Sequence, residues 1–121
     1  MADVEAVIAP WLEARLGVFA AAETPADLED ALPMIRVERI GGSDDRFSLH
    51  PRIAVDVFAA TADGARTLSE QIREALVFLN GPVGVAVVRS VRCDVGPTRQ
   101  PWGNEAIHRR GATYTVSLRS A

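Results

Sequence analysis

Cys93 and His108 are the two side chains of this sequence that could together perform nucleophilic chemistry. A cysteine attacks as the thiolate, and a neighbouring histidine can accept its proton. However, Cys93 lies in the alternating, valine-rich run 85–95, where a cysteine behaves as a small apolar core residue. We therefore interpret Cys93 as structural and expect no thiol–imidazole pair.

The consecutive carboxylates of Asp44 and Asp45 are the clearest candidates for acid–base chemistry. Such chemistry needs an environment that separates the pKa values of two carboxyl groups, as an apolar pocket does. The run Ser43–Arg46 is instead polar and rich in turn-forming residues, which predicts a solvated loop. We expect these carboxylates to lie on the surface.

Metal and nucleotide sites find no support in the spacing of the residues. Neither His50 nor His108 has a Cys or His neighbour at metal-ligand spacing, although Asp44, Asp45 and Asp56 could supply oxygen ligands. The chain contains no GxGxxG, GxxxxGK[ST], GxSxG or HExxH motif. We expect no metal, no cofactor and no enzymatic activity.

The thirteen basic residues are all arginine, and the densest group is Arg89, Arg92, Arg109 and Arg110. Proteins that bind nucleic acid combine a basic excess with interleaved aromatic residues. Here only Tyr114 is interleaved, and the net charge is −3. The arginines therefore favour an ion-paired protein interface over a nucleic-acid surface.

The two ends of the chain carry opposite charges. Residues 1–30 contain seven acids and one arginine, whereas residues 86–121 contain six arginines and two acids. This asymmetry fits head-to-tail association of copies, because a heterologous interface joins two different patches of one subunit. An acidic helix and basic strands within a solvated monomer would give the same pattern.

Trp102 follows Pro101 in a run rich in Gly and Pro, where little local core is expected. An exposed loop aromatic is a candidate anchor for a protein interface. A Trp102 folded back onto the sheet is an equal alternative.

Apolar periodicity predicts two helices and four strands. The first helix spans residues 4–19 and is kinked at Pro10, and Thr61 or Asp63 caps the second. Gly41-Gly42 ends the first strand. The remaining elements are strands over 34–40, 52–60, 85–95 and 106–119, a helix over 65–79 and a loop over 96–104. The predicted fold is α+β with the order α-β-β-α-β-β, an antiparallel sheet carrying both helices on one face.

The composition is that of one globular domain, here residues 1–121, with 48% apolar and 24% charged residues. The start lacks a basic segment, and no apolar stretch approaches the roughly 20 residues that span a bilayer. The single cysteine requires no oxidising compartment. We expect synthesis in the cytoplasm and no membrane contact.

Three segments resemble tail terminator proteins of long-tailed actinobacterial phages. The first is Leu32–Phe47, and the second is Arg52–Thr61 with the helix that follows it. The third runs from Val95-Gly96-Pro97 through Pro101-Trp102 and Asn104 to Arg109-Arg110 and Ala112-Thr113-Tyr114. The resemblance covers the chain from about residue 4 to residue 119 and keeps the order of the elements, but its motifs are structural and carry no catalytic residues.

The resemblance implies a structural virion protein at the head–tail junction, made in the host bacterial cytoplasm. Such subunits form a ring, usually a hexamer, that caps the finished tail tube. Their partners are copies of themselves, the major tail tube protein and the head connector, while DNA only passes through the lumen. Another minor head–tail connector or completion protein is the alternative, followed by a small ligand-binding or nucleic-acid-binding domain.

The expected contact residues are the loop from Gly42 to Phe47, Trp102 and nearby arginines, because long loops on a rigid sheet commonly carry binding. The full set is Arg36, Arg39, Asp44, Asp45, Arg46, Phe47, Trp102, Arg109 and Arg110. The predicted core comprises Val55, Val57, Leu68, Ile72, Leu76, Val91, Tyr114 and Val116.

Overall fold

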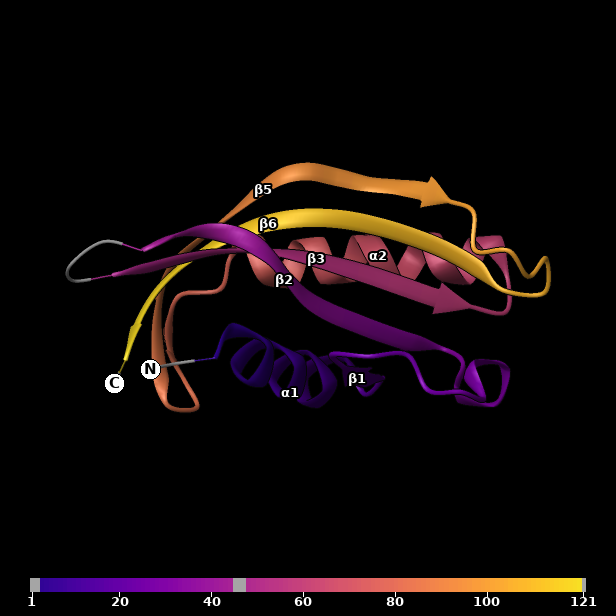
Figure 1. The fold of residues 1–121 in the computed structure, drawn as a ribbon, viewed down its shortest axis with the longest axis horizontal. Coiled ribbons are helices and arrows are strands. Elements are labelled where there is room, and N and C mark those ends of the chain that lie inside the picture. The colour runs from indigo at the N-terminus through magenta and orange to yellow at the C-terminus, as the bar shows by residue number, and fades with distance from the viewer. Residues whose placement is uncertain (1–2, 45–47, 121) are drawn as a thin grey trace.

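A computed structural model describes residues 3–44 and 48–120 (Figure 1). Two helices and six strands form one mixed α+β unit, and the α+β class predicted from the sequence is confirmed. The elements are α1 (Val4–Leu16), β1 (Phe19–Ala21), the 3₁₀ turn η1 (Leu28–Ala31), β2 (Met34–Asp44), β3 (Leu49–Ala59), α2 (Ala62–Val77), β4 (Gly81–Val83), β5 (Ala86–Gln100) and β6 (His108–Ser120).

The strands form one sheet in the order β1-β2-β3-β6-β5-β4. Its four long strands are antiparallel neighbours, as expected. The prediction of a wholly antiparallel sheet is wrong at one margin, because β1 pairs with β2 in parallel. The predicted order of elements also lacked β1 and β4, which are three residues each and too short to show a periodic pattern.

Helix α1 begins at Asp3, whose side chain accepts a hydrogen bond from the Glu5 backbone N–H. Pro10 lies within the helix, and Gly17 ends it with a φ of 68°. The helix is therefore shorter than the predicted 4–19. Phe19 belongs instead to β1, where it pairs with Met34.

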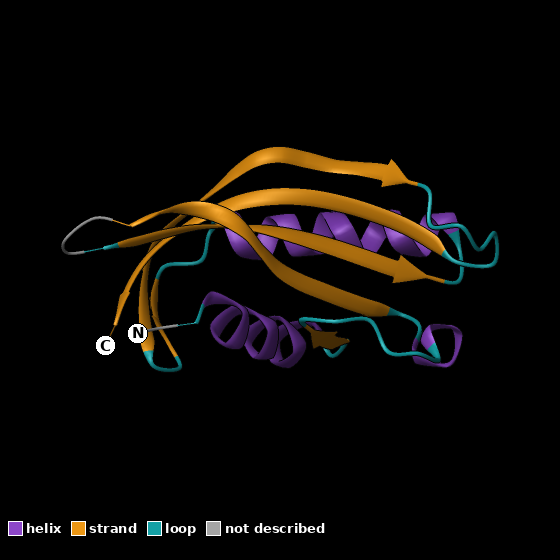
Figure 2. Ribbon diagram, in the orientation of Figure 1, coloured by secondary structure: helices purple, strands orange, loops and turns teal. Residues whose placement is uncertain are grey.

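Helix α2 begins at Thr61, one of the two predicted caps, whose hydroxyl accepts a hydrogen bond from the Gly64 backbone N–H. Its apolar stripe packs with that of α1 on the same face of the sheet, and the helices lie together on one side of the strands in Figure 2. Every residue of the predicted core is buried there, which confirms that part of the prediction. Burial also raises the pKa of Tyr114 well above its ordinary value.

The long strands extend beyond their predicted ends. Strand β2 passes through Gly41 with a register shift and ends at Asp44. Gly42 has a φ of 109°, and a side chain there would collide with the backbone of His50. The glycine pair thus lets the hairpin continue rather than ending the strand.

Strand β5 runs to Gln100, through half of the predicted loop, and changes register three times against β6. The first shift turns Val88 instead of Val87 into the core, and Val95 is 53% exposed. Strict alternation along residues 85–95 predicts that Val87 and Val95 face the core together with Val91 and Cys93. That prediction is wrong for Val87 and Val95, because bulges break the two-residue alternation. In the described part of the chain, no helix is both long and apolar enough to span a membrane.

Candidate functional site

The face of the sheet opposite the helices carries an aspartate shared by two arginines. Asp56 of β3 is 3% exposed. Its Oδ2 accepts from Arg36 Nη2 of β2 at 2.7 Å, and its Oδ1 accepts from Arg109 Nη2 of β6 at 3.1 Å. Each carboxylate oxygen therefore has a guanidinium donor, which balances the cost of burying the charge.

Gly111 makes room for this arrangement. It lies opposite Asp56 in the register of β3 and β6. A Cβ at residue 111 would stand 2.6 Å from Asp56 Oδ1 and 2.7 Å from Gln100 Nε2. A side chain here would displace the carboxylate from its arginine partners.

Two aromatic rings cover the guanidinium groups. Trp102 meets Phe58 edge to face, with ring centroids 4.8 Å apart. The guanidinium carbons of Arg36 and Arg109 lie 5.4 and 5.9 Å from the Phe58 centroid, and 5.8 and 5.5 Å from that of Trp102. Trp102 is thus folded back onto the sheet, within a small second core that includes Met34.

A second aspartate repeats the pattern nearer the middle of the same face. Arg92 Nε lies 2.7 Å from Asp94 Oδ1, and Arg52 Nε lies 3.4 Å from Oδ2. Thr115 Oγ1 donates to Oδ2 at 2.5 Å. The hydroxyl of Thr115 and the two guanidinium groups lower the pKa of Asp94.

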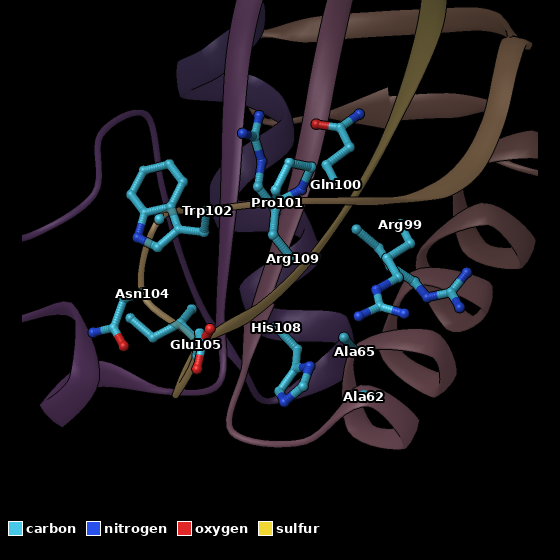
Figure 3. Close-up of a pocket in the computed structure, with 13 residues that line it drawn as sticks. Ala62, Ala65, Arg99, Gln100, Pro101, Trp102, Asn104, Glu105, His108 and Arg109 are labelled. Atoms are coloured by element: carbon cyan, nitrogen blue, oxygen red, sulfur yellow. The ribbon is translucent and has the colours of Figure 1, made fainter.

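A hollow of about 550 Å³ opens where β5 ends and β6 begins. Arg99 of β5 and Arg110 of β6 are direct cross-strand partners and both line it. Figure 3 shows Arg99 and His108 beside Ala62 and Ala65, in the first turns of α2. Trp102, Asn104 and Glu105 form its opposite wall.

The predicted contact residues fall into separate places. Arg36, Trp102 and Arg109 meet around Asp56, whereas Arg110 lines the hollow. Arg39 and Asp44 lie near the β2–β3 hairpin end and form an exposed pair at 3.7 Å. Asp45, Arg46 and Phe47 lie outside the described residues.

The hairpin and Trp102 lie at opposite ends of the sheet. Asp44 pairs with Leu49 at one end of β3, whereas Phe58, which contacts Trp102, lies near the other. With 11 residues in β3 and about 3.3 Å per residue, these ends are roughly 30 Å apart. The two regions cannot form one continuous patch on a single subunit.

The thiol and the imidazole considered in the sequence lie apart. Cys93 pairs with Tyr114, whereas His108 pairs with Ala59 at the start of β6. That separation is roughly 20 Å along a strand. Across residues 3–44 and 48–120, no three His, Cys, Asp or Glu side chains form a group that could hold a metal ion.

Sequence reasoning missed Asp56 as the centre of a network and Arg99 as part of the hollow. Alternation along residues 52–60 puts Asp56 and Phe58 on one face of the strand and Ile53, Val55 and Val57 on the other. A charged residue at such a central strand position is the signal for a buried ion pair. Arg99 carried no signal, because residues 96–104 were expected to form a loop.

Comparisons with known proteins add no family: no protein-family model matches the chain, and no curated protein matches it significantly.

Proposed function

We propose that this chain is a ring-forming structural subunit at the head–tail junction of a long-tailed bacteriophage, of the tail terminator kind. Three segments spread over residues 32–114 resemble such proteins. The two helices and four antiparallel long strands are compatible with the same proposal. Another minor head–tail connector protein remains the closest alternative.

The observation that carries the proposal is that both flanks of the sheet keep unpaired strand edges. Within the described residues, β4 covers β5 only at Ala86–Val88, and β1 covers β2 only at Met34–Arg36. Beyond these residues, the outer edges of β5 and β2 face away from the sheet (Figure 1). An open edge is a ready surface for another chain.

These edges are restricted to short stretches. On β2, the Glu5 carboxylate accepts from the Arg39 backbone N–H at 2.7 Å, which closes that position. On β5, bulges and Pro97 interrupt the edge after Cys93. Pairing of the β2 edge of one copy with the β5 edge of the next joins two different patches, so it is heterologous and could close a ring.

A ring of this kind acts mechanically. One face matches the last ring of the major tail tube protein, and the other matches the head connector instead of a further tube subunit. Tube growth then stops, because the exposed face no longer offers the surface that a tube subunit binds. No bond is made or broken, and DNA passes through the lumen.

Deleting the coding sequence from the genome that carries it, and supplying the chain in trans, tests the proposal. Negative-stain electron microscopy should show overlong or headless tails without the chain and normal particles with it. Charge reversal at Asp44 and Asp45 should leave a folded protein and weaken the rescue, because surface changes cost under about 0.5 kcal/mol. Particles with normal tails and heads after the deletion would overturn the proposal.

A further inference from the structure

Three pairs of arginines lie on the long strands of this sheet, and two of them share an aspartate. Arg36 and Arg109 share Asp56, and Arg52 and Arg92 share Asp94. In both cases the carboxylate lies between two guanidinium groups and balances part of their charge. In both pairs the two arginines come from strands on either side of a third strand, β3 in the first pair and β6 in the second, and the carboxylate offsets the repulsion between them.

The third pair, Arg99 and Arg110, has no such acid. The two residues are direct cross-strand partners, an arrangement in which like charges destabilise a sheet. Among the described residues, neither side chain makes a hydrogen bond or ion pair. Both line the hollow at the end of the sheet, which is therefore a cavity with two arginines that no described acid pairs with.

The other groups around the cavity strengthen its preference for an anion. His108 lies on the same side as Arg99, beside the first turns of α2 (Figure 3). The start of a helix carries partial positive charge. Glu105 is the one carboxylate that lines the cavity among the described residues, and it lies on the opposite wall, beside Asn104.

An acidic corner lies at the same end of the sheet, on the other flank. Asp27, just before the η1 turn, and Asp30 within it are exposed, and their side chains make no hydrogen bond or ion pair with the described residues. Both aspartates line a second hollow, which has a volume of about 430 Å³. Trp102, Asn104 and Ile107 line both hollows, so one wall separates the acidic corner from the cationic cavity.

The two features also lie toward opposite margins of the sheet. The η1 turn leads into β2, next to one margin, whereas Arg99 belongs to β5, next to the other. The two patches of opposite charge are neighbours on one subunit, on the two sides of the shared wall, and each opens toward a different margin of the sheet. A second copy placed beside this end of the sheet can therefore bring its acidic corner to the cavity.

We propose that the cavity formed by Arg99, Arg110 and His108 binds Asp27 and Asp30 of a second copy of this chain. This inference rests on the proposed ring and names the contact that closes it. The acids of the neighbour occupy the place that Asp56 and Asp94 hold in the other arginine pairs.

Paired cysteines test the contact directly, even where association is weak. On a Cys93→Ser background, Asp30→Cys and Arg99→Cys chains are oxidised separately and as an equimolar mixture. The mixture should yield a cross-linked dimer that neither variant forms alone. Cross-linking no greater than in the separate samples would overturn the inference.

The second experiment exchanges the charges of the two patches. Self-association of the full chain is measured by sedimentation velocity, and the wild-type chain is the reference. Arg99→Glu/Arg110→Glu should weaken self-association by about tenfold or more, and adding Asp27→Arg/Asp30→Arg to the same chain should restore it. Arg66→Glu/Arg73→Glu makes the same change of charge on the exposed face of α2 and should have little effect.

The outcomes separate the two proposals. Rings that form normally from Arg99→Glu/Arg110→Glu would overturn this contact and leave the ring intact as a proposal. A specific cross-link in a chain whose deletion leaves phage tails normal would support the contact and overturn the tail function. Binding of inorganic phosphate at Arg99 and Arg110 without any cross-link would show a small-anion site instead of a subunit contact.

Discussion

The face of the sheet under the helices and the opposite face hold the same strands together by different interactions. On the covered face, aliphatic side chains from α1, α2 and the long strands form a continuous core. On the open face, Asp56 and Asp94 each join strands through arginines, and aromatic rings cover one of these networks.

This difference between the two faces affects how precisely each one fixes the register of the strands. Apolar contacts are not directional, so the core constrains register mainly through the two-residue alternation, and a slip of two residues would still place apolar side chains on the covered face. A carboxylate that must meet guanidinium groups from both neighbouring strands accepts one register only. We infer that the covered face supplies most of the stability, while the open face specifies how β2, β3 and β6 align.

Removing a core side chain should have the largest effect on stability. Ile72 is 1% exposed at the centre of the stripe of α2. Ile72→Ala should lower the free energy of unfolding by about 2–5 kcal/mol, through lost transfer energy and the cavity left behind. Denaturant unfolding measures this, and Arg73→Ala, an exposed change on the same helix, is the control. An unchanged midpoint for Ile72→Ala would contradict the helix register.

Neutralising Asp56, which pairs with Arg36 and Arg109, should have an intermediate effect on stability. Asp56→Asn keeps the shape but leaves Arg36 and Arg109, whose side chains are only 17% and 22% exposed, without their counter-charge. We expect a loss of about 1–3 kcal/mol. Asp63→Asn, which changes a 91% exposed side chain, should cost much less. Equal losses from the two variants would show that the Asp56 network does not stabilise the fold.

Neutralising Asp94, which contacts Arg52, Arg92 and Thr115, should have the smallest effect on stability, and this effect should depend on pH. Because folding lowers the pKa of Asp94, its carboxylate stabilises the fold above the ordinary aspartate pKa of about 3.9. This contribution disappears as pH falls through the folded-state pKa. Asp94→Asn should therefore cost up to about 1 kcal/mol at neutral pH. The difference in melting temperature between the wild type and Asp94→Asn should disappear in acid, as measured by thermal unfolding at several pH values. A gap that widened in acid would reverse the sign argued here.

The main elements and most of the core could be predicted from the sequence, because their signal is local. The apolar stripe of α2 repeats over four turns, and Ile53, Val55 and Val57 alternate cleanly in β3. Such patterns depend on the period of a helix or strand alone. The same reasoning failed for Val87 and Val95, where bulges in β5 changed the period within a strand.

The candidate site depended far less on local pattern. Asp56 finds its partners 20 and 53 residues away in the chain, and Trp102 meets Phe58 only because the loop after β5 folds back over β3. That Arg99 and Arg110 lie side by side without an acid between them can be seen only once β5 and β6 are paired.

The sequence by itself determined which residues are apolar, where helices begin, and that the arginines outnumber the acids near the end of the chain. The tertiary structure alone decided which arginine receives which aspartate, because strand register brings distant residues within the few ångströms over which ion pairs and hydrogen bonds act.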